Sequence, residues 1–273
     1  MYKPNPKIAA IQMVSSANFK ANLAKAESLI IDAVKEGADL VVLPEYFALM
    51  ANKERDKFET MEIHQQGVMQ QTFSQLAKKL KVWIVVGTHP IQSEQPERPF
   101  GRCYVFNDLG EQVAWYDKIH LFDVDLDDNH GSYCESQYTK PGDTPVCFDT
   151  PWGKMGLAVC YDLRFPELFR KLVEEGCEIF IMPAAFTYAT GEVHWQTLIK
   201  ARAIENLCYF VASAQGGSHE NGRQTWGHSC IVSPWGEVLQ DLPSGEGYVL
   251  AELDREKQAS KRKEFPVLLH KKL

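Results

Sequence analysis

Two hydrophobic periodicities alternate along the chain and predict an α/β fold. Short apolar runs of strand length occur at Lys7–Val14, Asp39–Leu43 and Val82–Thr88. Between them, Asn18–Glu36 and Val68–Leu80 carry apolar residues at helical spacing. Continuously apolar runs are typical of strands buried on both faces, so we expect helices to cover a sheet.

The pattern changes after residue 100, where paired strand-like segments flank turn sequences. The three connectors are Asp108-Leu-Gly-Glu, Pro151-Trp-Gly-Lys and Pro234-Trp-Gly-Glu. Each places a glycine where a hairpin requires a positive φ after a type I turn. Further helices are expected at Pro166–Glu175 and Glu192–Asn206, and further strands at Glu178–Met182, Cys208–Ala214 and Gly247–Leu253. Hairpins mixed with alternating helices favour sheets that pack on each other and carry helices on their outer faces.

Composition narrows the class of protein. The chain has 273 residues and no low-complexity linker, so we expect one domain over residues 1–273. The net charge of −7, from 29 Lys+Arg against 36 Asp+Glu, argues against a nucleic-acid partner. No apolar run is long enough to cross a bilayer and no signal peptide is recognisable, which predicts no membrane partner and a cytoplasmic location. The seven cysteines are scattered without a Cys-x-x-Cys pair, so neither a disulfide framework nor a zinc site is expected.

One cysteine has a context that suggests chemistry. Within Met155–Leu168, an apolar run ends at Cys160 and a helix-like segment follows. A helix N-terminus lowers the pKa of a nearby thiol and favours the reactive thiolate. The sequence therefore indicates a nucleophile at Cys160, with a buried structural thiol as the alternative.

Two other strand-like runs end in groups that suit such a thiol. Glu45 follows one buried strand, and Lys118 follows another. A partly desolvated carboxylate has a raised pKa and can act as a base, and an ammonium can stabilise an oxyanion. A thiol, a carboxylate base and a cationic donor are sufficient for acyl transfer, although each residue alone would be interpreted as a cap or a surface group.

Other functions remain open on the residues alone. His120, His194 and His228 keep a Cys-His hydrolase possible, and a thiol redox protein or a catalytically silent scaffold are further alternatives. The chain contains no Gly-x-Gly-x-x-Gly, no phosphate-binding loop and no Gly-x-Ser-x-Gly, so no cofactor and no metal are expected. An acidic stretch lacks the calcium-loop pattern and is interpreted as a solvated loop; it contains Asp123, Asp125, Asp127 and Asp128.

At these residues the chain resembles the nitrilase superfamily of carbon–nitrogen hydrolases, in particular its Nit branch of small amidases. Three dispersed motifs carry the resemblance in the order Leu43-Pro44-Glu45, Asp117-Lys118-Ile119-His120-Leu121-Phe122-Asp123 and Gly156–Glu167. Supporting matches are His194-Trp195, Arg202–Asn206 and Gly227-His228-Ser229 with Pro234-Trp-Gly.

The resemblance implies an α-β-β-α sandwich that forms a homodimer or a higher homo-oligomer, with residues 254–273 as a possible dimer contact. It places the base at Glu45, the oxyanion-stabilising lysine at Lys118 and the nucleophile at Cys160. It also implies that Glu135 positions Lys118 and the substrate, and that the backbone N–H of Tyr161 completes the oxyanion hole.

The implied activity is hydrolysis of a small, carboxylate-bearing linear amide to an acid and ammonia through a thioester. The resemblance favours deaminated glutathione as the substrate; the alternatives are α-ketoglutaramate-type amides and N-carbamoyl compounds. Arg164, His194, Arg202 and Lys140 are candidates for binding the carboxylate, with Arg164 also interpretable as a structural residue at a helix start. Tyr46-Phe47 and Asp123–Tyr133 depart from the family pattern, and we expect both to border the pocket.

Overall fold

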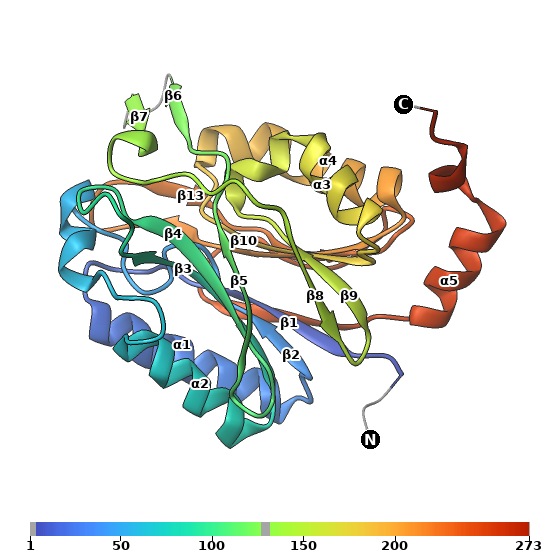
Figure 1. The fold of residues 1–273 in the computed structure, drawn as a ribbon, viewed down its shortest axis with the longest axis horizontal. Coiled ribbons are helices and arrows are strands. Elements are labelled where there is room, and N and C mark those ends of the chain that lie inside the picture. The colour runs from blue at the N-terminus through green and yellow to red at the C-terminus, as the bar shows by residue number, and fades with distance from the viewer. Residues whose placement is uncertain (1–3, 127–131, 273) are drawn as a thin grey trace.

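Two six-stranded sheets form the centre of the molecule (Figure 1). They are seen in a computed structural model that describes residues 4–126 and 132–272. The first sheet has the strand order β16 (Gly247–Glu252), β1 (Lys7–Gln12), β2 (Leu40–Val42), β3 (Trp83–Ile91), β4 (Phe100–Phe106) and β5 (Gln112–Asp117). Its central strands β1, β2 and β3 run parallel, while β16, β4 and β5 join in antiparallel pairs.

The second sheet repeats this arrangement. Its order is β15 (Val238–Leu242), β14 (Ser229–Val232), β11 (Tyr209–Ala214), β10 (Ile179–Ala184), β9 (Gly153–Leu157) and β8 (Val146–Thr150). Strands β9, β10 and β11 are parallel, and β14, β15 and β8 pair antiparallel. Two smaller hairpins lie outside the sheets: β6 (Asp123–Asp125) with β7 (Ser132–Cys134), and β12 (Gly216–Ser218) with β13 (Gln224–Trp226).

Helices cover the outer face of each sheet (Figure 1). Those on the first sheet are α1 (Phe19–Lys35) and α2 (Val68–Leu80), and those on the second are α3 (Pro166–Glu174) and α4 (Tyr188–Asn206). The alternation along β1 shows why: Ile8 and Ala10 belong to the core between the sheets, while Ala9 and Ile11 belong to the core under α1 and α2. The predicted four-layer α-β-β-α sandwich is confirmed.

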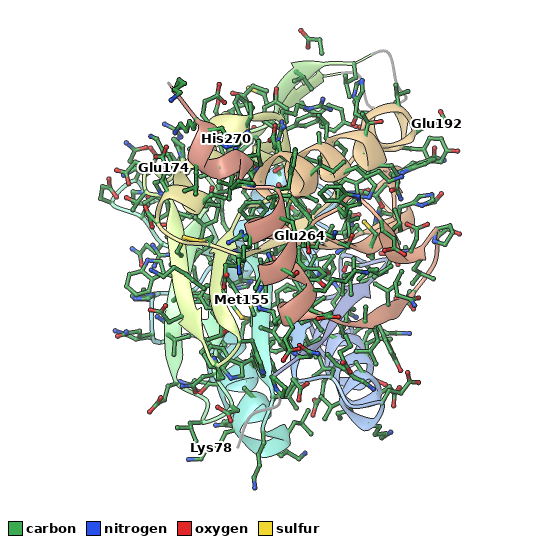
Figure 2. The ribbon with its side chains drawn as sticks, turned by 90° about the vertical axis from the view of Figure 1, so that its right-hand side faces the viewer. Lys78, Met155, Glu174, Glu192, Glu264 and His270 are labelled. Carbon is green, nitrogen blue, oxygen red and sulfur yellow. A yellow bond between two sulfur atoms is a disulfide. The ribbon has the colours of Figure 1, made fainter. Side chains whose placement is uncertain are left out.

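A terminal helix, α5 (Arg255–Glu264), docks on the side of the sandwich and faces the viewer in Figure 2. Gln258 is its anchor, because its buried amide donates hydrogen bonds to the carbonyls of Glu178 at 2.8 Å and Leu207 at 2.9 Å. Short 3₁₀ helices span Glu54–Thr60, Glu135–Gln137, Cys160–Arg164 and Val267–His270. None of the helices in the described ranges is long and apolar enough to cross a membrane.

The predicted hairpin turns are confirmed: Gly110, Gly153 and Gly236 all have positive φ. Helix α4, however, begins at Tyr188 rather than at the expected Glu192. The helix passes through Gly191, where Trp226 packs so closely that a Cβ on the glycine would lie 2.2 Å from the Cβ of Trp226.

Two other expectations need correction. Asp123–Asp125 was expected to be a solvated loop, but it pairs with Ser132–Cys134 as a hairpin; Asp127 and Asp128 lie outside the described residues.

The expectation that no cysteines pair is also wrong, since Cys147 on β8 and Cys177 before β10 form a disulfide with their Cα atoms 6.6 Å apart. Their sequence separation of 30 gave no sequence signal, because the two meet only when β8, β9 and β10 lie side by side in the second sheet.

Candidate active site

Three strand ends from both sheets converge at the site. Glu45 follows β2, Lys118 follows β5 and Cys160 follows β9. All three side chains line one cavity, and each residue is no more than 8% exposed. The sequence placed these groups on separate strands, and the sandwich brings them together.

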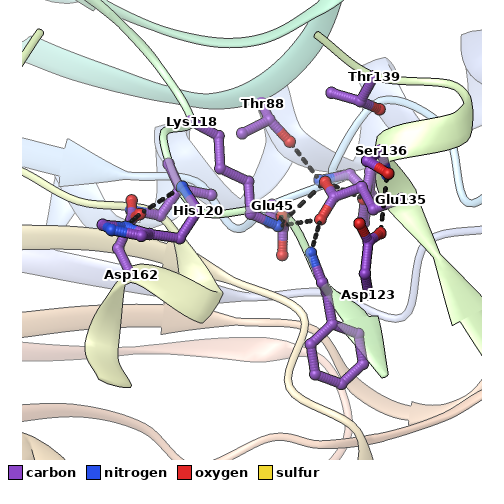
Figure 3. Close-up of polar contacts among 12 residues, drawn as sticks. Glu45, Thr88, Lys118, His120, Asp123, Glu135, Ser136, Thr139 and Asp162 are labelled. Carbon is purple, nitrogen blue, oxygen red and sulfur yellow. Dashed lines mark hydrogen bonds and ion pairs between the residues drawn. The ribbon is translucent and has the colours of Figure 1, made fainter. Parts of the chain in front are cut away.

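Lys118 lies between two carboxylates (Figure 3). Its Nζ donates to Glu45 Oε1 at 2.8 Å and to Glu135 Oε2 at 2.8 Å. Burial alone would lower the pKa of Lys118, but the two carboxylates hold it well above its usual value. Lys118 is therefore a fixed ammonium, and Glu135 is placed to position it.

The two carboxylates differ in proton affinity. Burial raises the pKa of Glu45, and Lys118 offsets this only in part because Glu135 adds a second negative charge. Burial would also raise the pKa of Glu135, but Lys118 and the N–H of Phe122 hold it below its usual range. Glu45 is thus the better proton acceptor of the pair.

The Cys160 thiol is hydrogen-bonded to Glu45 and protonated in the resting site. Burial raises its pKa well above the usual value, and the Glu45 carboxylate raises it further; Lys118 and a hydrogen bond from the Ala185 backbone compensate only in part. The expectation that a helix N-terminus lowers this pKa is wrong. Cys160 opens a 3₁₀ turn, and α3 begins only at Pro166.

The backbone of the turn at Cys160 is strained and firmly held. Cys160 has φ +48°, a value that non-glycine residues rarely adopt. Asp162, fully buried in the same turn, accepts hydrogen bonds from the Val159 N–H at 2.7 Å and the Tyr116 hydroxyl at 2.7 Å. It also accepts from the His120 N–H at 3.1 Å, so it joins the cysteine turn to the segment that carries Lys118 (Figure 3).

The backbone at Glu45 is held from both sheets. The Tyr46 N–H donates to Thr88 Oγ1 at 3.2 Å, at the point where the β3–β4 register shifts. From the second sheet, the buried side chain of Gln215 donates to the Glu45 carbonyl at 3.0 Å and accepts from the Ser15 N–H at 3.0 Å.

A cavity of about 190 Å³ lies over the three groups. The described residues of its wall include Tyr46, Glu54, Tyr133, Glu135, Tyr161, Phe186, Thr190 and Arg223. Tyr46 and Tyr133, which lie in the two segments that depart from the family pattern, border the pocket as expected. Phe47 does not, because it is buried and packs on Phe73 with their ring centres 5.3 Å apart. Sequence reasoning missed Arg223, which stands in a polar stretch without a motif.

None of the four residues suggested for carboxylate binding lines this cavity. Arg164 lies behind its wall, over the rings of Tyr161 and Phe186, and its guanidinium is 3.3 Å from the exposed His194.

The other two are engaged elsewhere. The buried Arg202 donates to the Leu163 carbonyl at 3.1 Å and pairs with Glu205. Lys140 pairs with Glu94.

The histidines that left a Cys-His hydrolase open lie elsewhere too. His120 binds Asp162 at 2.6 Å, and His228 binds Asp241 at 2.8 Å. No histidine in the described part of the chain lines the cavity.

Comparison with known proteins agrees with this geometry. Residues 7–263 match the Carbon-nitrogen hydrolase family. A deaminated glutathione amidase of Yersinia enterocolitica is 41% identical over 97% of this chain and 93% of its own length. The human deaminated glutathione amidase is 38% identical over 98% of this chain and 82% of its own.

Solved structures show the same fold. The NitFhit protein of C. elegans superimposes with a TM-score of 0.90 at 32% identity, covering all of this chain and 66% of that longer one. Nit3 of Saccharomyces cerevisiae, a member of branch 10 of the nitrilase superfamily, superimposes with a TM-score of 0.86 at 31% identity over 97% of both chains. The chain therefore belongs to the carbon-nitrogen hydrolase family.

Proposed function

We propose that the protein is a cysteine-dependent amidase whose substrate is deaminated glutathione. The observation that carries the chemistry is the contact of one buried ammonium with two carboxylates beside a buried thiol. The substrate is suggested by the names of the relatives, which cover nearly the whole chain at about 40% identity.

In the first half of the reaction, Glu45 accepts the Cys160 proton as the sulfur attacks the amide carbon. A C–S bond forms and the carbonyl electron pair moves to oxygen. Lys118 Nζ contacts Glu45 Oε1 and both carboxylate oxygens of Glu135. In the proposed reaction the two oxygens of Glu135 share one of its three N–H groups, Glu45 accepts the second, and the third serves the oxyanion. The N–H of Tyr161, in the first turn of its 3₁₀ helix, has no partner within that helix and is the second donor.

Protonated Glu45 then gives its proton to the amide nitrogen, the C–N bond breaks, and a thioester remains. Glu45 next takes a proton from water; the water oxygen bonds to the acyl carbon, and the C–S bond breaks. Return of the proton to sulfur restores the thiol.

The identity of the leaving group differs from what the sequence predicted. Deaminated glutathione is the tripeptide glutathione without its α-amino group, so it contains peptide bonds but no primary amide. Cleavage between the keto-acid part and cysteine releases an amine, cysteinylglycine, rather than ammonia. Ammonia is the product only with primary amides such as α-ketoglutaramate.

The test is turnover by the purified protein, followed by mass spectrometry of both products. We expect 2-oxoglutarate and cysteinylglycine from deaminated glutathione, and a loss of about 10⁴-fold or more in kcat for Cys160→Ala with the fold unchanged by circular dichroism. A retained rate in Cys160→Ala would contradict the mechanism. A higher kcat/KM for α-ketoglutaramate or an N-carbamoyl amino acid would replace the substrate but keep the chemistry.

We also propose a homodimer with the C-terminal segment as a contact. Large apolar side chains near this segment are exposed: Trp235 by 56%, Phe265 by 50% and Leu269 by 83%. Light scattering at micromolar concentration tests this, and a monomeric mass would contradict it.

We propose a cytoplasmic location because five of the seven cysteines are free thiols. The Cys147–Cys177 disulfide is of a kind that is commoner outside the cytosol, and imaging of a tagged chain decides between the two compartments.

A further inference from the structure

Arg223 is the cation of the cavity wall that none of the chemistry above uses. It follows the turn between β12 and β13 and reaches the same cavity as Cys160. Its position is built by the fold, since the His219 N–H donates to its carbonyl at 2.9 Å and its own N–H donates to Asn221 Oδ1 at 3.0 Å. Asn221 in turn donates to the Ala51 carbonyl at 2.7 Å, which ties the turn to the first half of the chain.

Two aromatic rings hold the guanidinium. Its central carbon lies 5.7 Å from the ring centre of Tyr46 and 5.8 Å from that of Tyr133. Rings at these distances stabilise the cation through their faces. The Tyr46 ring is itself fixed, because its hydroxyl donates to Glu135 Oε1 at 3.2 Å.

Among the residues that the structure describes, none accepts a hydrogen bond from the guanidinium edge of Arg223. The other charges of the wall are compensated: Lys118 serves Glu45 and Glu135, and Glu54 pairs with Lys57 at 3.4 Å. Within residues 4–126 and 132–272, no carboxylate forms an ion pair with Arg223 and no oxygen accepts from its guanidinium. A held guanidinium with free donors is suited to bidentate binding of a carboxylate.

We propose that Arg223, held between Tyr46 and Tyr133, is the specificity-determining residue that binds a carboxylate of the amide substrate. This rests on the proposed amidase function and replaces the four candidates suggested by the sequence. The residue selects substrates and takes no part in the proton transfers.

The first test measures binding without turnover. In Cys160→Ala, calorimetry with glutarate should show binding that Arg223→Gln weakens about 10- to 100-fold, as expected for loss of a charge-assisted pair. Arg223→Lys should lie between the two, because an ammonium keeps the charge but lacks the planar fork. Equal affinity with and without Arg223, or no binding of glutarate to either protein, would overturn the proposal.

The second test uses turnover of matched amides in the otherwise wild-type enzyme. Glutaramate and valeramide differ by a carboxylate on the acyl side, and N-pentanoylglycine and N-ethylpentanamide differ by one on the amine side. Arg223→Gln should lower kcat/KM for the carboxylate member of one pair about 10- to 100-fold, mainly through KM, and should leave its neutral partner within about 3-fold. The affected pair identifies which side of the scissile bond Arg223 faces.

Arg164→Gln tests the rival assignment, in which Arg164 binds the carboxylate. If this variant removes the preference for the carboxylate and Arg223→Gln does not, the assignment to Arg223 is wrong. Equal losses on charged and neutral amides would show a merely structural role and would also overturn it. Failure of the proposed amidase function can be told apart from failure of the Arg223 assignment. If the function is wrong, the wild type hydrolyses none of the amides, and the glutarate measurement still decides whether Arg223 binds a carboxylate.

Discussion

At the scale of single residues, one carboxylate of the site has a raised proton affinity and the other keeps its negative charge. Glu45 and Glu135 contact the same ammonium, yet the pKa of Glu45 is raised by burial while the pKa of Glu135 is lowered by Lys118 and a backbone N–H. Glu135 therefore stays ionised and holds Lys118, while in the proposed mechanism Glu45 exchanges protons with Cys160. Because burial raises the pKa of the Cys160 thiol, the proposed reaction relies on the base beside the thiol rather than on a preformed thiolate.

This assignment predicts the pH dependence of the reaction. Glu45 must be ionised to accept the thiol proton, and its pKa is raised, so kcat/KM should fall as the pH drops through a value above that of an ordinary glutamate. Valeramide is the suitable substrate because it carries no group that titrates in this range. A rate that stays constant down to the ordinary glutamate pKa would contradict the role of Glu45.

At the scale of elements, a shift in the register of β3 positions the base. Between Val86 and His89 the pairing with β4 is irregular, and Gly87 there lies directly against the turn that carries Glu45. A Cβ on Gly87 would lie 1.8 Å from the Pro44 carbonyl oxygen. The strand can approach this turn only because residue 87 has no side chain.

Gly87→Ala should therefore displace the Glu45 turn. We expect a loss of about 10- to 100-fold in kcat together with a destabilisation of about 1–3 kcal/mol, as found for overpacked interiors. Gly101→Ala on the neighbouring strand is the matched control, since its Cβ would meet nothing closer than 3.8 Å. Steady-state kinetics and urea unfolding measure both effects, and equal behaviour of the two variants would refute the close-approach argument.

At the scale of the whole molecule, the site depends on how the two sheets are seated. Cys160 comes from the second sheet, while Glu45 and Lys118 come from the first. Gln215 joins the two halves, because it leaves the second sheet and binds the backbone of Ser15 and Glu45. The same side chain that joins the two halves thus also anchors the backbone that carries Glu45, the proposed base.

Gln215→Leu should accordingly affect stability and catalysis together. The substitution leaves the buried Ser15 N–H and Glu45 carbonyl without these partners, which costs about 2–4 kcal/mol in the free energy of unfolding. We expect kcat to fall as well, because Glu45 loses an anchor. Gln240→Leu, at an exposed position of β15, is the control, and urea unfolding with parallel kinetics is the measurement. A stable variant with full activity would show that Gln215 does not couple the sheets.

The sequence by itself determined most of the elements and led to the proposed reacting groups. Periodicity located helices such as Val68–Leu80 to the residue, and apolar runs ending near Glu45, Lys118 and Cys160 predicted the chemistry, because both signals are local. Tertiary structure decided what depends on distant neighbours. The raised pKa of Cys160 comes from burial beside Glu45, the pairing of Cys147 with Cys177 comes from packing, and the position of the Arg223 guanidinium comes from rings contributed by two other segments. No local pattern contains these contacts, since each forms only when residues remote in the chain are brought together by the sandwich.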